Sequence, residues 1–292
     1  MQEFLKEVIL GTFGDSRVGS IGLHDLDDGA SFGDNYIITT DGHTVKPVFF
    51  NGGDIGRLAA CGTFNDVSVM GARPILLTSS MIIQSGFEMD GIKEIMTSIR
   101  KSCDEVGAKL VAGDTKVVED DIGIYISTTG VGERWDGLDH NRDMLRECGR
   151  EGDVFVRDCG LMPGDNIILS GTVGDHGVSL MALREELGIF GDLCSDVCPI
   201  WDVVEKALLA GGVSAMKDPT RGGISGALNE MAAKSGCGIL IEEENIPTNR
   251  STVAASEILG INIHDVANEG KVIMGVAEDR AEEVLKAVKR SG

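Results

Sequence analysis

Five acidic positions in this sequence stand near glycines, where carboxylates could converge. Four are turns at the ends of predicted strands or the starts of helices, and the fifth lies inside a predicted helix. They are Asp27-Asp28, Asp41, Asp114, Asp218 and, in the helix, Asp66. Each alone is weak support, because surface turns favour Asp, whose side chain bonds its own backbone. Together they suggest a carboxylate cage for Mg²⁺ that would hold phosphate oxygens.

The helix that carries Asp66 is predicted from the stretch Asn51–Ala72. Asp54 is a good N-cap after the pair Gly52-Gly53, and apolar or small residues then recur at helical spacing. Asp66 falls on this apolar stripe, with Asn65 beside it. A buried, unpaired carboxylate costs several kcal/mol or takes up a proton. Asp66 therefore has either a cationic partner in the protein, such as an Arg, or a cation from solution.

The glycine-rich turns do not match the usual nucleotide-binding motifs. Gly171–Gly177 lacks the Lys and Ser/Thr of a P-loop, and GxGxxG is absent. The net charge of −21 argues against a nucleic-acid partner, because binding a phosphate backbone needs clustered Lys and Arg. A strongly acidic protein can still bind a nucleotide when a divalent metal bridges its carboxylates to the phosphates.

Length and composition fit a globular protein with room for two domains. The chain has 292 residues, 42% of them hydrophobic, and no stretch is apolar enough to span a membrane. Residues 1–10 form a short amphipathic pattern with internal charges, unlike a signal peptide. Seven cysteines without such a signal favour a reduced, cytoplasmic protein. Cys194 and Cys198 have no second pair at zinc-finger spacing, so a zinc site is not favoured.

Strand-type and helix-type patterns are mixed along the whole chain. Strands are predicted at 36–40, 75–83, 109–112, 122–131, 154–156, 166–169, 238–242 and 271–277. Helices are predicted at 1–10, 90–106, 200–210, 220–235, 251–259 and 279–290, around Asp66, and after Gly171–Gly177. This mixture predicts the α/β (α+β) class. The polar stretch 134–152 is the best boundary, giving an N-terminal domain at 1–150 and a C-terminal domain at 151–292.

Several of these motifs resemble a known superfamily. DDGA (27–30), TTDG (39–42), NDVSVMGA (65–72), AGDT (112–115) and DPTRGG (218–223) resemble the aminoimidazole ribonucleotide synthetase, selenophosphate synthetase and thiamine-monophosphate kinase superfamily. Longer strings are narrower: VKPVFFNGGDIG (45–56), GDTKVV (113–118), SGTVGDHG (170–177), DPTRGGISGALNE (218–230) and VANEGK (266–271) resemble the HypE family of hydrogenase-maturation dehydratases. The resemblance runs from about Asp27 to Gly292.

The resemblance implies an ATP-dependent carbamoyl dehydratase that converts a thiocarboxamide on its own C-terminal cysteine into a thiocyanate. The thiocyanate supplies cyanide ligands to the iron of nickel–iron hydrogenases. The implied fold is an N-terminal α/β domain whose sheet pairs across a homodimer, followed by a C-terminal α/β domain. ATP and Mg²⁺ are expected near that interface, and the partners are a carbamoyltransferase and an iron-scaffold protein. The apolar strand at 75–83 supports a dimer, because it needs cover on both faces or at its edge.

The resemblance also implies roles for individual residues. The carboxylates of Asp28, Asp41, Asp66, Asp114 and Asp218 would hold Mg²⁺ and so orient the triphosphate. The residues implied to contact the nucleotide are Asp41, Asp66, Asp114, Thr115, His176 and Arg221. For His176 a structural role is an equal alternative.

Two further residues match family positions assigned to proton transfer, namely Lys116 and Glu269. A base must remove N–H protons while the nitrile forms. In the alternative interpretation Lys116 simply touches phosphate and Glu269 is a surface acid beside Gly270. Because an isolated Lys keeps its proton to about pH 10, Lys116 by itself is a poor base at neutral pH.

Two features of the family are missing from this sequence. One is the glycine-rich HGxGG stretch ahead of the first helix, and the other is the C-terminal Pro-Arg-Ile-Cys; the last cysteine here is Cys237. The chain as given is expected to bind ATP but not to complete self-modification. Two alternatives stay open: another ATP-dependent enzyme of the superfamily, and a non-catalytic nucleotide-binding scaffold for maturation partners. A selenophosphate synthetase should offer an N-terminal reactive Cys beside a glycine-rich loop, and none is visible.

Overall fold

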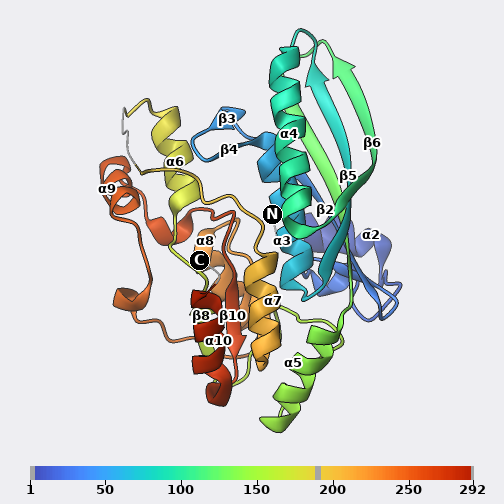
Figure 1. Ribbon diagram of the computed structural model, residues 1–292, viewed down its shortest axis with the longest axis vertical. Helices are drawn as coiled ribbons and strands as arrows, with labels where there is room; N and C mark the ends of the chain where they lie inside the picture. The colour runs from blue at the N-terminus through green and yellow to red at the C-terminus, as the bar shows by residue number, and fades with distance from the viewer. Residues whose placement is uncertain (1–3, 188–191, 291–292) are drawn as a thin grey trace.

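The N-terminal part of the computed structural model is a mixed sheet covered on one face by two helices (Figure 1). The structure describes residues 4–187 and 192–290. Within them, five strands run in the order β1-β2-β7-β5-β6, and only β5 and β6 pair in parallel. Their bounds are Ala30–Phe32 (β1), Tyr36–His43 (β2), Arg73–Gln84 (β5), Lys109–Val118 (β6) and Ile124–Glu133 (β7). The chain therefore places β6 at one edge of this sheet, where it pairs with β5 alone.

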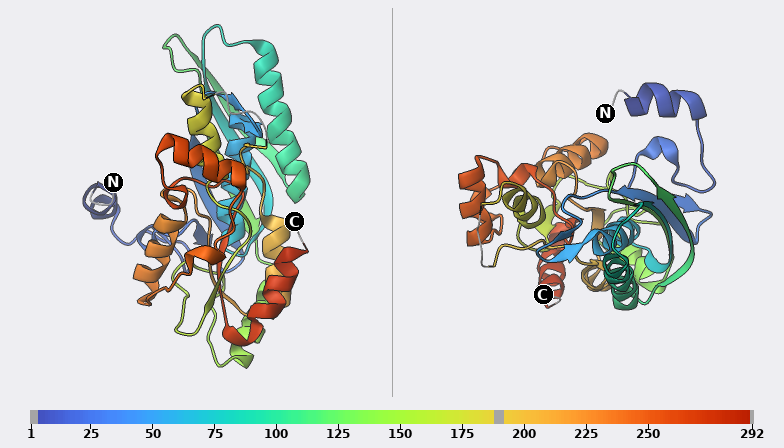
Figure 2. Two further views of the ribbon diagram at one scale, coloured as in Figure 1. Left: turned by 90° about the vertical axis from the view of Figure 1, so that its left-hand side faces the viewer. Right: turned by 90° about the horizontal axis from the view of Figure 1, so that it is seen from above.

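Helices α3 (Ile55–Val69) and α4 (Met89–Val106) cover one face of this sheet. The side chain of Asp54 accepts hydrogen bonds from the backbone N–H groups of Gly56 and Arg57, which confirms the predicted N-cap of α3. The apolar side of α4 buries Ile95 and Ile99, as its periodicity predicts. Before this sheet come a π-helical turn, η1 (Leu5–Leu10), and α2 (Gly11–Phe13), which stand out from the body in Figure 2.

A three-stranded sheet organises the C-terminal part, with the order β8-β10-β9 among the described residues. The strands are Asn166–Leu169 (β8), Val213–Lys217 (β9) and Ile273–Val276 (β10). Helices α7 (Trp201–Ala210) and α10 (Ala281–Lys289) pack on the face that carries Met216 and Met274. Helix α8 (Gly223–Ser235) packs on the opposite face, against Ala215 and Ile273. The remaining elements are α6 (Asp175–Arg184), α9 (Arg250–Leu259), the small ladder β3 (Phe49–Phe50) with β4 (Gly53–Asp54), and the 3-10 turns η2 (Leu23–Asp25), η3 (Glu243–Asn245), η4 (Ile263–Asp265) and η5 (Glu278–Arg280).

The mixed α/β class is confirmed, but two strand predictions are wrong and one helix was not predicted. Residues 134–152 contain a helix, α5 (Asp136–Glu147), whose Asn141 exchanges two hydrogen bonds with the backbone of Val213 on β9. Residues 154–156 form no strand, and only Arg157 makes an isolated bridge, to Ala215. Residues 238–242 do not pair with a strand either. The sequence signal of each was local, and partners elsewhere in the chain decided its conformation.

One hydrophobic core runs through both parts of the molecule. It includes Phe64 and Val67 of α3, Leu77 of β5 and, from the C-terminal part, Val204 and Met274. Helix α3 therefore packs against the N-terminal sheet on one side and against the C-terminal part on the other. No helix of residues 4–187 and 192–290 has both the length and the apolar character needed to cross a membrane.

Close packing between α3 and β7 depends on Gly132. A Cβ atom at Gly132 would lie 2.3 Å from Cγ1 of Val67 and 2.9 Å from Cβ of Ala72, closer than real Cβ contacts come. We expect Gly132→Ala to lower the free energy of unfolding by about 1–3 kcal/mol, because the helix must shift away from the sheet. Gly42→Ala on β2 is the control, since a Cβ there meets nothing within 4 Å. Urea denaturation midpoints that fall equally in both variants would contradict this account of the α3 packing.

Candidate active site

Four of the predicted carboxylates converge where the two parts of the molecule meet. Asp66 lies on α3, Asp41 on β2, Asp218 directly after β9, and Asp28 in the loop before β1. Burial, followed by the charges of Asp218, Asp28 and Asp41, raises the pKa of Asp66 well above its usual range. Burial and the neighbouring Asp28 likewise raise the pKa of Asp218 to about 8. These carboxylates repel one another and would be stabilised by a cation placed among them.

Asp66 has a hydroxyl partner and no cationic one in the described part of the chain. The Thr39 hydroxyl lies 3.0 Å from Oδ2 of Asp66 and 2.9 Å from the backbone oxygen of Asp28, and it is positioned to donate to either oxygen. Thr39 thereby links α3 to the loop that carries Asp28. Among the ion pairs of residues 4–187 and 192–290, none includes Asp66. The interpretation of Asp66 as one half of an Arg pair therefore finds no support in the structure.

The unsatisfied oxygens of this cluster fit a metal that arrives together with phosphate. Oδ2 of Asp28 and Oδ2 of Asp218 are both buried without a hydrogen-bond partner. Yet no group of three or more His, Cys, Asp or Glu side chains within the described residues is arranged to hold a metal ion by itself. Magnesium typically takes one or two protein carboxylates and completes its shell with water and substrate phosphates. The residues present fit that mode better than a cage made of protein alone.

Glu269 joins this cluster from the loop before β10. Burial raises the pKa of its carboxyl well above the usual range, and Asp218, Asp196 and Asp41 add to the effect in that order. Gly270 lets the chain pass close by, because a Cβ at this residue would lie 2.0 Å from the backbone oxygen of Asp196. Glu269 is thus not a surface acid, and it lies in the electrostatic field of the same Asp residues.

Asn65, the neighbour of Asp66, holds the Glu269 loop in place. Its side-chain nitrogen donates to the backbone oxygens of Glu269, at 3.0 Å, and Cys198, at 3.2 Å. Its side-chain oxygen accepts from the backbone N–H of Ile200 at 3.0 Å. All three partners belong to the C-terminal part. One turn of α3 therefore carries a cluster carboxylate and positions the loop of Glu269. Nothing in the sequence alone distinguished Asn65 as the residue that does this.

Three predicted site residues lie apart from this cluster within one protomer. They are Asp114, Thr115 and Lys116 on β6. In the sheet order, β6 is three strands from β2, which corresponds to about 14 Å at normal strand spacing. Lys116 pairs in register with Ile82, an exposed residue on the sheet face that α3 and α4 leave uncovered. Lys116 thus lies on the face opposite to Asp41, which points toward α3 beside Gly62.

His176 and Arg221 occupy different environments. His176 is buried, its Nδ1 lies 2.7 Å from the hydroxyl oxygen of Ser195, and its ring meets Phe50 edge-on. Burial lowers the pKa of His176 to about 4 despite the nearby Asp196, so its ring is neutral at pH 7. These contacts favour the structural role for His176. Arg221 is exposed just before α8.

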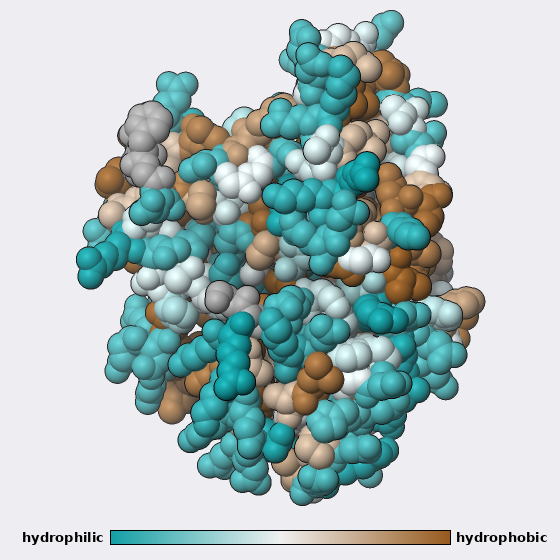
Figure 3. Space-filling view, in the orientation of Figure 1, coloured by the Kyte–Doolittle hydropathy of each residue, from teal (hydrophilic) through white to brown (hydrophobic). Residues whose placement is uncertain are grey.

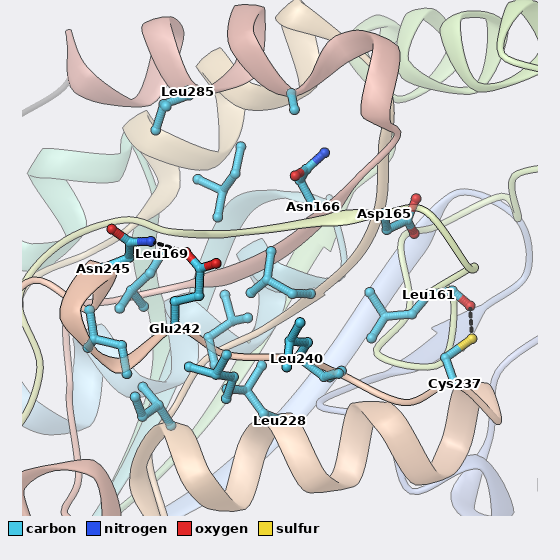
Figure 4. A pocket seen from close by; sticks show the side chains of 18 of the residues that line it. Leu161, Asp165, Asn166, Leu169, Leu228, Cys237, Leu240, Glu242, Asn245 and Leu285 are labelled. Atoms are coloured by element: carbon cyan, nitrogen blue, oxygen red, sulfur yellow. Dashed lines mark hydrogen bonds between the residues drawn. The ribbon is translucent and has the colours of Figure 1, made fainter.

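The structure also has a cavity that contains none of these residues. It has a volume of about 1000 Å³ and lies between β8, α8, α10 and residues 238–247 (Figure 4). Leu161, Leu228, Leu240 and Leu285 line it, and the Cys237 thiol bonds the backbone oxygen of Leu161. It opens beside the predicted strand at 238–242, where Leu240 is 92% exposed. Its lining is mainly apolar, unlike the carboxylate cluster.

Comparison with known proteins identifies the family. Residues 26–134 match the N-terminal domain of AIR synthase related proteins, and residues 162–292 match the C-terminal domain. The chain is 43% identical to a putative hydrogenase expression/formation protein of Methanocaldococcus jannaschii, over 99% of this chain and 83% of that protein. It is 42% identical to the carbamoyl dehydratase HypE of Rhizobium leguminosarum bv. viciae, over 88% of this chain and 70% of that protein. The chain belongs to the HypE family.

Solved structures of HypE proteins share the fold. A HypE–HypF complex matches with a TM-score of 0.87 and 39% identity, over 98% of this chain and 88% of that chain. A HypE in complex with ATP matches with a TM-score of 0.79 and 35% identity, over 98% of this chain and 78% of that chain. The match spans both the five-stranded and the three-stranded sheet, so the two-part architecture described above is that of the family.

The buried, neutral His176 predicts a defined acid sensitivity. Its pKa of about 4 lies below the ordinary value of 6.5, so between these pH values the unfolded chain binds the proton more readily than the folded one. The contribution of neutral His176 to the free energy of unfolding is therefore intact above pH 6.5 and is lost as the pH falls toward 4. The full loss is roughly 3 kcal/mol at about 1.36 kcal/mol per pKa unit.

The measurement is urea unfolding of His176→Asn and the parent across this pH range. Asn keeps a polar group near Ser195 but does not titrate, so its free energy of unfolding should depend less on pH. His24→Asn is the control, because His24 is exposed. An equal pH slope in His176→Asn and the parent would show that His176 does not cause the acid sensitivity.

Proposed function

We propose that this chain catalyses the ATP-dependent dehydration of a cysteine S-carboxamide to a thiocyanate, as a step in providing the cyanide ligands of nickel–iron hydrogenases. The proposal is supported by membership of the HypE family, whose members include the carbamoyl dehydratases and the ATP complex named above. The observation that carries it is that the Glu269 carboxyl lies near Asp218 and Asp41, the same two residues whose charges act on Asp66, at the junction of the two parts. Such a site brings a phosphate-binding group and a proton acceptor together.

The chemistry has two requirements that these residues meet. The amide oxygen is a poor leaving group until it is phosphorylated, and it then leaves as inorganic phosphate while ATP becomes ADP. Bound Mg²⁺ would supply charge neutralisation for the triphosphate. The carboxylates of Asp28, Asp66 and Asp218 would hold that ion and orient the phosphates. Glu269, whose pKa is raised by burial, is a stronger base than an exposed carboxylate and is suited to accept N–H protons as the C≡N bond forms.

Lys116 requires a second copy of the chain in this scheme. Within one protomer it lies on the uncovered sheet face, away from Glu269. That face exposes Tyr36, Ile38, Ile82 and Tyr125, and Figure 3 shows a hydrophobic area at the right-hand edge, where β6 lies. An exposed edge strand next to an apolar sheet face is a surface that proteins normally cover. We propose that two protomers pair through this face and that Lys116 of one acts at the Glu269 site of the other.

Pairing is tested by the mass in solution. The parent is expected to be a homodimer at micromolar concentration by light scattering. Ile82→Glu should shift it toward a monomer, because the charge would be buried at the interface. Leu240→Glu is the matched control, since Leu240 is also exposed but belongs to the C-terminal part. A monomeric parent, or equal effects of the two substitutions, would refute pairing through the uncovered face.

The roles of Lys116 and Glu269 are tested on a chain extended by the family's C-terminal Pro-Arg-Ile-Cys and carbamoylated at that cysteine. Dehydration then removes one water from the intact mass. Lys116→Ala and Glu269→Ala should each block this loss and keep ATP binding, because the Asp residues remain. If Lys116 acts across the dimer, mixing the two variants restores about a quarter of the parent activity, since random heterodimers retain one complete site.

The outcomes separate the possible roles. Conversion at the parent rate in either variant would remove that residue from the mechanism. Lost ATP binding in Lys116→Ala would reassign Lys116 to phosphate contact. Absence of recovery on mixing, with both variants inactive and dimeric, would place Lys116 and Glu269 in the same protomer's site. The HypE–HypF complex supports a further partner from hydrogenase maturation, and we propose that a carbamoyltransferase and an iron-scaffold protein bind this chain.

A further inference from the structure

A lysine side chain already forms an ion pair with one of the carboxylates assigned to the metal. Lys217 ends β9 and directly precedes Asp218. Its Nζ lies 2.8 Å from Oδ1 of Asp28 and 3.4 Å from Oδ2 of Asp158, and only 8% of the residue is exposed. Asp28 belongs to the N-terminal part and Lys217 to the C-terminal sheet. The ammonium is therefore an internal cation at the carboxylate cluster.

Lys217 contacts only one oxygen of Asp28. The other oxygen, Oδ2, is buried without a hydrogen-bond partner, as is Oδ2 of Asp218 in the next residue of the chain. A divalent cation bound at these open oxygens would lie close to the ammonium, and two cations so close repel each other strongly where water is excluded. A free divalent ion therefore competes with Lys217 for Asp28.

The surroundings give Lys217 an alternative partner. Asp158 is fully buried, and a second lysine, Lys234, bonds its Oδ2 at 2.6 Å. Glu230 lies 3.6 Å from Nζ of Lys217. When a nucleotide brings its own negative charge, the ammonium can stay among Asp158, Glu230 and the phosphates while Asp28 turns to the metal. Lys234 has no ion pair with Asp28 in the described part of the chain, although it shares Asp158 with Lys217.

We propose that Lys217 is a positioning residue that holds Asp28 in place in the nucleotide-free protein and prevents a free divalent cation from binding there. Metal then enters only together with the triphosphate, whose negative charge offsets the ammonium. This inference rests on the proposed metal role of Asp28. It couples metal binding to nucleotide binding and requires no conformational change larger than the movement of the Asp28 side chain.

The test uses Mn²⁺ as the probe, with free Mn²⁺ measured by electron paramagnetic resonance in the nucleotide-free protein. Lys217→Met should bind Mn²⁺ about tenfold or more tightly than the parent, because a single charge a few ångström away is removed. The affinity for Mn²⁺ in the presence of ATP should change much less. Lys234→Met is the matched control, since it also removes a lysine from Asp158; Lys234 acts on Asp28 only through space, so this variant should gain much less Mn²⁺ affinity than Lys217→Met.

Lys217→Gln is a second variant that is less prone to misfold, because its amide can still donate to Asp28 without carrying charge. It should show the same gain in affinity for Mn²⁺. Lys217→Arg should bind Mn²⁺ no better than the parent. The proposal is overturned if Lys217→Met and Lys217→Gln fold but gain no affinity, or if Lys234→Met gains as much.

Asp28→Asn separates this inference from the proposed function. Combined with Lys217→Met, it should abolish the gained Mn²⁺ site. If Asp28→Asn alone leaves Mn²⁺ binding with ATP unchanged, the metal role of Asp28 in the proposed function is wrong and the inference falls with it. If Asp28→Asn loses that binding while Lys217→Met gains nothing, the proposed function stands and only the role of Lys217 is refuted.

Discussion

Mutual repulsion among buried carboxylates is the constraint on which this structure depends. After burial, the charges of Asp218 and Asp28 raise the pKa of Asp66, Asp28 raises that of Asp218, and Asp218 raises that of Glu269. Charged groups in this position are tolerated only where a counterion, a proton or a bound cation offsets them. In the nucleotide-free chain Lys217 supplies part of that charge. A metal–nucleotide complex would supply the positive charge that is still missing.

Helix α3 fixes the positions of the Asp66 carboxylate and of the Glu269 loop relative to each other. Gly130 and Gly132 of β7 allow the helix to pack closely on that strand, and its N-cap at Asp54 sets where the helix begins. Consecutive residues then act on different parts of the molecule, with Asn65 bonded to the C-terminal backbone and Asp66 bonded to Thr39 on β2. A movement between the two parts would therefore disturb the Asp66 carboxylate and the Glu269 loop together. Nucleotide binding at this junction is expected to stabilise the arrangement of both parts.

The edge position of β6 separates the GDTK segment from the carboxylate cluster within one protomer. The GDTK segment is part of a regular strand, and residues on one strand alternate between the two sheet faces. Asp114 and Lys116 must then share a face, and register with Ser80 and Ile82 puts them on the uncovered one. A site that also uses Glu269 draws on the opposite side of the sheet. The proposed pairing of two protomers would let Lys116 act at the site of the partner copy without any change in the fold of either.

The sequence by itself determined the α/β class, the N-cap and stripe of α3, helix α4 and the acidic motifs, because helical periodicity and turn chemistry are local. It also determined the family, since long motifs occur in order. Only the tertiary structure decided that residues 238–242 stay unpaired, that residues 136–147 form a helix bonded to β9, and that Asn65 and Lys217 support the cluster. Hydrogen bonds and ion pairs between residues distant in the chain fix these features. The tertiary structure also separated Lys116 from Glu269. The sheet register, which no local sequence pattern encodes, decides which face of the sheet each side chain occupies.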